Sequence, residues 1–164
     1  MKILLSQFSA YHLWANQLLM DRIEKLPQEL QTQKVSSSFS SLHATLLHMW
    51  DAEAIWWQRM KLLVQIVIPS EGFTGTTNDV IKGLMNQSKQ WHEWIMAAHE
   101  HMFDHEFIYH NSKKEQFKQP IYQMLLHLFN HGTYHRGQLV TIMRQLQVGN
   151  IPQTDFIVWS RKKS

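Results

Sequence analysis

Four long segments of the chain space their apolar residues with the period of an α-helix, and this feature limits the fold more than any other. The segments are 3–26, 39–63, 77–102 and 120–147. Apolar residues that recur every three or four positions line one side of a helix, and that side has to be buried against another element. Because few segments alternate as strands do, the pattern predicts an all-α fold, an antiparallel four-helix bundle.

Residues that begin and end helices lie close to these boundaries. Pro27 directly follows the first segment, and Pro120 opens the fourth, where its fixed φ suits a first turn. Residues 36–38 are serines that offer N-caps to the second segment, and Gly149 can close the fourth. The second segment is rich in tryptophan and apolar on nearly every side, so we expect it to be deeply buried.

The connections between the segments differ in kind. Residues 66–76 form a long crossover with a proline and two glycines, and residues 106–120 have two short apolar–polar runs that favour a small hairpin or a loop laid over the bundle. The tail 151–164 carries an apolar run from Phe156 to Trp159 that we expect to pack back onto the domain. Two connections are long enough to permit a helix order in which successive helices are not neighbours.

Length and composition exclude several classes of protein. The chain has 164 residues and no cysteine, which suits a single domain over 1–164 and excludes disulfides, thiolate ligands and a cysteine nucleophile. The net charge is +3, and the basic residues are dispersed apart from 161–163, so we expect no nucleic-acid binding. There is no run of 18 apolar residues and no signal-peptide pattern, so we expect a cytoplasmic protein that does not contact a membrane.

Histidines interrupt the apolar stripe of the fourth segment. His127, His131 and His135 recur every fourth residue among leucines, so we expect them on the inward face of the helix. His131 and His135 are one turn apart, close enough for two imidazoles to share one metal ion. His48 lies on the second segment between two alanines, whose small side chains leave space for a site in the bundle core.

Two interpretations of these histidines compete. A single inward histidine is usually satisfied by a hydrogen bond. Several inward histidines on two helices favour a shared purpose, since burying imidazoles without partners is costly. Three histidine ligands would leave a coordination position open, as catalytic metal sites do.

A second group of histidines lies at the end of the third segment. His99, His101 and His105 lie near Asp104 among charged residues, and His101 is off the apolar stripe. This position favours a solvated helix end over a second metal site. His43 could line the interior without a deciding feature, and three more histidines have no partner that the sequence identifies: His12, His92 and His110.

Three stretches together resemble one known family. They are NHGTYHRGQL at 130–139, YHLWANQLL at 11–19 and LHATLLHMWDAEAIWWQRM at 42–60. The first is similar to the most characteristic motif of the DinB/YfiT-like proteins, a superfamily regarded as metal-dependent enzymes, and the order and spacing of all three match. The resemblance covers about 11–147.

The resemblance implies an antiparallel four-helix bundle with a His₃ metal centre. Carried over by position, the ligands are His48, His131 and His135, and His127 supports the site without binding the metal. The family implies nickel or zinc, with iron as a third metal, and a homodimer. It also implies a small-molecule substrate, because some relatives transfer low-molecular-weight thiols such as bacillithiol or mycothiol onto electrophiles.

The sequence therefore predicts a metal-dependent enzyme that activates water, as a hydrolase does, or an exogenous thiol, as an S-transferase does. The alternative is a non-catalytic metal-binding or stress-related helical protein. No general base is assigned.

Other residues lie near the histidines on these two helices. Glu53, one turn beyond His48, and Gln138, near His135, are candidates for side chains that support the ligands. We expect Arg136 to form a surface or interface salt bridge, because it is off the inward stripe. Gly132 and Gly137 weaken the helix, which suggests close packing or a dimer contact.

Overall fold

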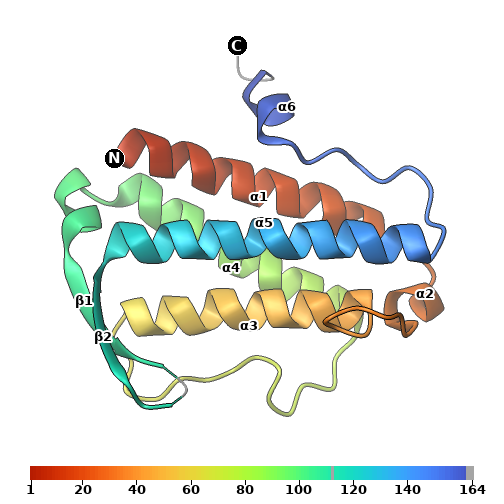
Figure 1. The fold of residues 1–164 in the computed structure, drawn as a ribbon, viewed down its shortest axis with the longest axis horizontal. Helices are drawn as coiled ribbons and strands as arrows, with labels where there is room; N and C mark the ends of the chain where they lie inside the picture. Colours follow the sequence, from red (N-terminus) through yellow and green to blue (C-terminus); the bar gives the residue numbers. More distant parts are fainter. Residues whose placement is uncertain (112, 162–164) are drawn as a thin grey trace.

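The computed structural model describes residues 1–111 and 113–161, and Lys162 and Lys163 of the basic C-terminal run lie outside them. The described chain is mostly helical (Figure 1). The long helices are α1 (Lys2–Glu24), α3 (Leu42–Met60), α4 (Thr77–Ala97) and α5 (Ile121–Gln145). The short elements are α2 (Gln28–Thr32), the 3₁₀ helix η1 (Glu100–Asp104), the strands β1 (Glu106–His110) and β2 (Gln116–Pro120), and α6 (Phe156–Arg161).

The four predicted helices are present, with corrected ends. The third stops at Ala97 instead of 102, and the residues after it form η1. The second begins later than the serines at 36–38 suggested: Ser41 is its N-cap and accepts a hydrogen bond from the Ala44 amide at 3.1 Å. Thr76 caps α4 with a complete capping box, and the helix begins at the predicted residue, 77.

The four long helices lie side by side in two pairs of opposite direction (Figure 1). Helix α1 runs parallel to α5, because the contact of Phe8 with Phe129 is followed about two turns later on both helices by that of Asn16 with Arg136. Helices α3 and α4 are also parallel, since the crossover 61–76 carries the chain back along α3 before α4 begins. The expected antiparallel packing therefore holds for α1 against α4 and for α3 against α5, and the other two neighbouring pairs are parallel.

Helix α3 is less deeply buried than its composition predicted, because 13 of its 19 residues are only half-buried. None of its residues is exposed. Leu42, Leu46 and Met49 belong to one apolar cluster of the core, and Trp56 and Trp57 pack against the other. The ring of Phe73, from the crossover, meets Trp50 edge to face at 5.9 Å between centroids. The burial of α3 thus depends on the crossover as well as on the other helices.

The hairpin and the tail pack onto the helices. Strands β1 and β2 are antiparallel with Ile108 opposite Lys118, so the hairpin alternative is correct and the fold is mostly rather than purely helical. The tail packs back as predicted, with Phe156 against Phe8 and Tyr11 at 5.4 and 5.2 Å between ring centroids. No helix of the described residues is long and apolar enough to cross a lipid bilayer.

The two motif glycines give a matched test of packing. A Cβ on Gly132 would lie 2.5 Å from Cε1 of the buried His12 ring, whereas a Cβ on Gly137 would meet nothing within 4 Å. We expect Gly132→Ala to lower the free energy of unfolding by about 1–3 kcal/mol through overpacking. Gly137→Ala should raise it by up to about 1 kcal/mol through helix propensity. Urea unfolding measures both, and a Gly132→Ala protein as stable as the wild type would contradict the close packing.

Candidate metal centre

Three histidine rings converge between α3 and α5. The Nε2 atom of His131 lies 3.2 Å from that of His48 and 3.0 Å from that of His135. One nitrogen from each ring lies within 4.8 Å of the others. His131 and His135 come from successive turns of α5, and His48 comes from the antiparallel α3, so the fold brings together the three residues that the sequence singled out.

The spacing suits a shared cation better than shared protons. A ring nitrogen either donates one proton or accepts one, so Nε2 of His131 cannot satisfy both of its neighbours at once. Metal–imidazole bonds of about 2.0–2.1 Å that meet near a right angle or slightly wider separate the two nitrogens by roughly 3 Å. The distances of 3.0 and 3.2 Å from Nε2 of His131 to its two neighbours fall in that range. The residues therefore fit a divalent ion.

Gln138 fixes the orientation of one ring. Nδ1 of His135 donates to Oε1 of Gln138 at 2.7 Å, which leaves the lone pair on Nε2, the atom that faces the other rings. The Gln138 amide donates in turn to the hydroxyls of Ser38 and Tyr134, at 3.2 and 3.1 Å. The sequence prediction of a supporting role for Gln138 agrees with this contact.

The three rings are held in the neutral form that binds metals. Burial lowers the pKa of His48, with Asp51 opposing the shift, and burial lowers the pKa of His135. Burial, followed by the charges of the neighbouring histidines, lowers the pKa of His131 to about 3. At neutral pH all three imidazoles can offer a lone pair without first losing a proton.

The low pKa of His131 predicts how the metal-free protein responds to acid. The unfolded chain takes up a proton on this residue below about pH 6.5, and the folded chain does so only near pH 3. The unfolded state therefore binds more protons between these values, and stability should fall as the pH falls through them. Between pH 8 and pH 5, in the presence of a chelator, the free energy of unfolding should fall less for His131→Gln than for the wild type. Urea unfolding measures both. Equal losses would contradict the shift.

An aromatic side chain covers part of the site, and the sequence did not identify it. The ring of Phe39 stacks on His48 at 4.3 Å between centroids and meets His135 edge to face at 5.7 Å. Phe39 precedes α3, although the sequence had placed it at the start of that helix. His48 and His131 remain half-buried, so the centre lies in the side of the helix assembly and not deep in its core.

The other predicted histidines are not members of the converging group. His127 is exposed instead of inward, and its ring lies between those of His131 and Trp56, at 5.9 and 5.4 Å. His101 contacts the rings of His99 and His105, but the described residues of this group do not converge as metal ligands. Two histidines have hydroxyl partners: His43 bonds Thr77, and His92 bonds Ser9.

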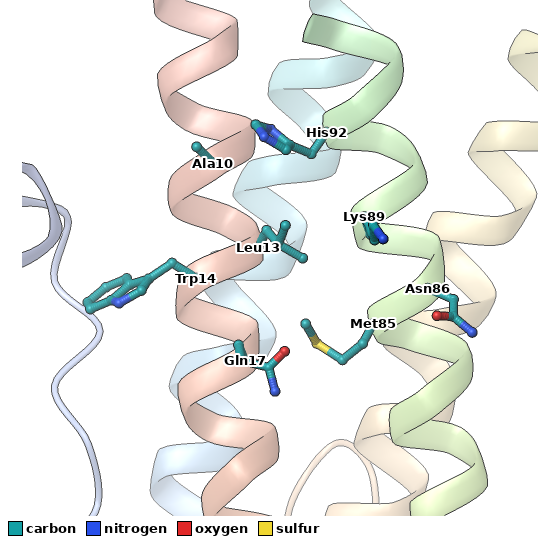
Figure 2. Close-up of a pocket in the computed structure, with 8 residues that line it drawn as sticks. All are labelled: Ala10, Leu13, Trp14, Gln17, Met85, Asn86, Lys89 and His92. Atoms are coloured by element: carbon teal, nitrogen blue, oxygen red, sulfur yellow. The ribbon is translucent and has the colours of Figure 1, made fainter. Parts of the chain in front are cut away.

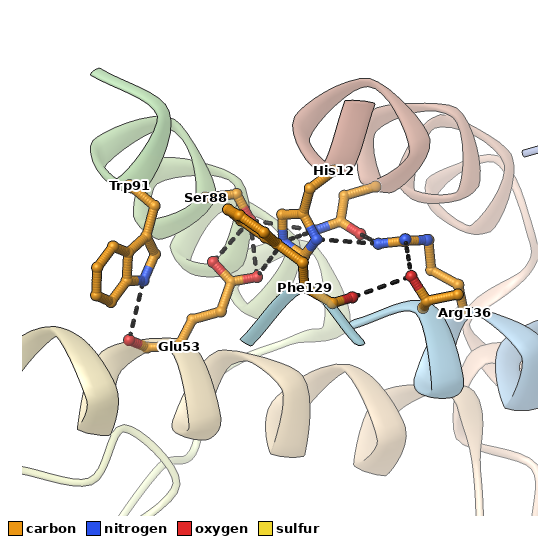
Figure 3. Close-up of polar contacts among 8 residues, drawn as sticks. His12, Glu53, Ser88, Trp91, Phe129 and Arg136 are labelled. Atoms are coloured by element: carbon orange, nitrogen blue, oxygen red, sulfur yellow. Dashed lines mark hydrogen bonds and ion pairs between the residues drawn. The ribbon is translucent and has the colours of Figure 1, made fainter. Parts of the chain in front are cut away.

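A buried polar network, shown in Figure 3, occupies the middle of the helix assembly and links all four long helices. Nη1 of Arg136 donates to Nδ1 of His12 at 3.1 Å, which places the ring proton on Nε2, and Nε2 donates to Glu53 at 2.9 Å. The Ser88 hydroxyl lies 3.0 and 2.9 Å from the two Glu53 oxygens. The Asn16 amide joins Arg136 to Ser88, accepting from one and donating to the other.

The network corrects three predictions. Arg136 is 2% exposed, so it forms no surface or interface salt bridge. Burial lowers the pKa of Arg136, with Tyr11 and Glu53 opposing the shift. His12 was left without a partner and is a central member. Glu53 bonds His12 and Ser88 and has no hydrogen bond to the three converging histidines, so it does not support them directly.

A cavity of about 500 Å³ lies elsewhere, on the face between α1 and α4 (Figure 2). Leu13, Trp14 and Met85 give it apolar walls, and Lys89 and His92 lie at its side. Lys89 is paired with Glu93 at 3.6 Å and His92 with Ser9 at 2.9 Å. None of the three converging histidines lines this cavity, so the chemistry of the centre does not depend on it.

The fold and the site can now be compared with known proteins. The DinB family model matches residues 1–159. The chain belongs to the DinB family. Protein DinB of Bacillus subtilis (strain 168) is 28% identical, over 89% of this chain and 87% of its own length. A DinB-like protein from Bacillus cereus ATCC 10987, solved by crystallography, shares the fold with a TM-score of 0.62 at 16% identity, over 85% of this chain and 90% of that one.

The DinB family match confirms the resemblance that the three sequence stretches predicted. It extends to residue 1 and to residue 159, beyond the range of 11–147 that the motifs covered. In this DinB-family chain, the hairpin and the α6 tail are therefore part of the matched region.

Proposed function

We propose that this DinB-family protein is a metal-dependent enzyme with a His₃ centre in a four-helix bundle, formed by His48, His131 and His135. One observation carries the proposal: three imidazole nitrogens from two helices face a common point. The converging group has three members among the described residues, and three protein ligands leave room for a water or a substrate. A divalent ion held by these residues would lower the pKa of a water or thiol that binds it, and so would provide a nucleophile near neutral pH.

The side chains around the centre have distinct tasks in this proposal. Gln138 keeps the lone pair of His135 directed at the ion through its hydrogen bond to Nδ1. Phe39 covers one side of His48 and His135 and limits the approach of water to the other side. Because the chain has no cysteine, a thiol substrate has to come from outside the protein.

The chemistry of the donors favours particular metals. Three neutral imidazoles with no thiolate and no carboxylate suit a borderline divalent ion. We propose nickel or zinc, with iron as a third candidate. We also propose that the substrate is a small molecule, that the protein works in the cytoplasm without nucleic acid or membrane, and that it forms a homodimer.

The test of this function is a metal-dependent assay with two arms. The protein, loaded with Ni²⁺ or Zn²⁺, is mixed with a low-molecular-weight thiol and a chromogenic electrophile, or with a nitrophenyl ester and no thiol. We expect at least a tenfold rate over background in one arm, and a background rate after chelation or with His131→Ala. The arm that responds identifies thiol transfer or hydrolysis.

The non-catalytic alternative makes the opposite prediction. A protein that only binds metal, or responds to stress by binding it, would hold one equivalent of metal and show a background rate in both arms with every cellular thiol. Chelation should leave the fold intact if the centre serves a reaction. Unfolding on chelation would indicate a structural metal instead.

A further inference from the structure

Arg59, near the end of α3, is a partly buried cation without a counter-charge. Its guanidinium lies 4.8 Å from the centre of the Trp56 ring and 5.6 Å from that of Tyr109. No carboxylate and no hydrogen-bond acceptor contacts it among the described residues, and its Nε is buried without a partner. The other buried arginine, Arg136, has three polar partners, so Arg59 is unusual for this chain.

A cavity opens next to this cation. It has a volume of about 360 Å³ and lies where the end of α3, the start of the crossover and β1 meet. Arg59 and His110 are its basic or polar members, and its walls are otherwise apolar or aromatic, formed by Leu62, Leu63, Val64, Ile66, Ile108 and Tyr109. A cavity of this size with one charged group is typical of a site for a small ligand.

One residue of the apolar wall, Leu62, has an unfavourable backbone conformation. Leu62 has φ of 55°, a left-handed conformation that favours glycine just past a helix end. Its side chain is nevertheless large and 65% exposed. A glycine would satisfy the turn equally well, so the leucine points to a use for its side chain at the cavity.

We propose that this cavity binds a small carboxylate with an apolar body, its carboxylate on Arg59 and its body against the leucine and valine side chains. Because Nε is closed off, the carboxylate meets the terminal Nη atoms of the guanidinium, which are well suited to carboxylate oxygens. The two aromatic rings hold the guanidinium in a fixed plane, so little side-chain freedom is lost on binding.

The proposed site is separate from the histidine centre. Arg59 and His48 are eleven residues apart on α3, a rise of roughly 16 Å along the helix. The rings of Trp56 and His127 lie between them, with Trp56 in contact with both Tyr109 and His127. The inference therefore goes beyond the proposed enzyme and holds whether or not the centre is catalytic.

Octanoate is a suitable probe, and octanamide is its uncharged match. Titration calorimetry on the full chain should show octanoate binding at least tenfold more tightly than octanamide. Arg59→Met keeps an unbranched apolar stem and removes the charge, so it should abolish that difference, while Arg59→Lys retains part of it. Arg144→Met is the control, because Arg144 is exposed on α5 and its loss should change neither affinity.

Two further measurements make the result decisive. The affinity for octanoate should be unchanged by a chelator and by His131→Ala. A carboxylate that bound the metal instead would lose its affinity under both conditions. The indole N–H signal of Trp56 should shift on titration. No binding at millimolar octanoate, equal binding of octanamide, or dependence on the metal would each overturn the proposal. The proposal would also fail if octanoate did not bind and the protein formed a dimer that Val64→Lys dissociates. The apolar wall of the cavity would then be an interface between two copies of the chain.

Discussion

His131→Ala and His135→Ala should each reduce metal affinity by at least about 100-fold, more than the loss expected when a supporting residue is removed. The reason is geometric: each ring supplies one of three nitrogens that face a common point, and two remaining imidazoles bind a divalent ion weakly. His48→Ala should behave in the same way. The measurement is metal content by elemental analysis after purification, followed by a competition titration with a chromogenic chelator.

Two control variants show whether the loss is specific. His127→Ala removes the exposed ring next to His131, and His101→Ala removes an exposed histidine of η1. Both should keep one equivalent of metal. Retention of metal by His131→Ala or His135→Ala would refute the ligand assignment, and loss of metal in His127→Ala would make His127 a fourth ligand. Circular dichroism of each variant establishes that the helices remain.

The helices and the converging histidines could be predicted because both depend on local periodicity. Apolar stripes identify helices, and a four-residue spacing puts His131 and His135 on one face whatever the rest of the chain does. His48 was found by the same argument on another helix, with the family resemblance in support. The exposure of His127 was missed because a four-residue step drifts around the helix, so the first histidine of the series is exposed while the last, His135, is buried.

The direction of the helices was harder to predict, since it depends on a connection. The crossover 61–76 has the length to return along α3, but its composition does not say whether it does so. Phe39 was missed for a similar reason, because a loop residue acquires its contact with His48 only through the path of the loop.

The buried network left a signal that single-residue reasoning did not use. His12 lies one turn from Phe8 and one turn from Asn16, on the apolar stripe of α1, and Glu53 continues the buried face of α3. Each alone could be a chance polar residue. A histidine and a carboxylate on the inward faces of two helices indicate a shared partner, and Arg136 on α5 completes the set only when the helix packing is known.

The network explains how a mostly apolar interior contains a cation and an anion. His12, Glu53 and Arg136 are 1%, 3% and 2% exposed, so water does not stabilise the charges of Glu53 and Arg136. The neutral His12 ring connects the guanidinium to the carboxylate, accepting from one and donating to the other. Since the four long helices all contribute side chains, the network also fixes how the helices are placed relative to one another, including α5 with two of the converging histidines.

Glu53→Gln should therefore be strongly destabilising, although it replaces only one carboxylate oxygen with an amide nitrogen. The buried Arg136 charge would lose its counter-charge, and such a loss costs about 3–5 kcal/mol of unfolding free energy, or roughly 6–20 °C in melting temperature for a chain of this size. Glu93→Gln is the matched control, because Glu93 pairs with Lys89 on the exposed side of α4 and should change stability by less than about 1 kcal/mol.

The double variant separates a charge effect from a packing effect. If uncompensated charge is the cause, Glu53→Gln combined with Arg136→Met removes both charges and should be more stable than the sum of the single losses predicts, by about 1–3 kcal/mol. Urea unfolding of the four proteins at pH 7 gives the coupling directly. Additive losses, or a Glu53→Gln protein as stable as Glu93→Gln, would mean that Arg136 keeps its charge without Glu53. In that case the neutral groups around it, His12, Asn16 and Thr133, would suffice to hold a buried guanidinium.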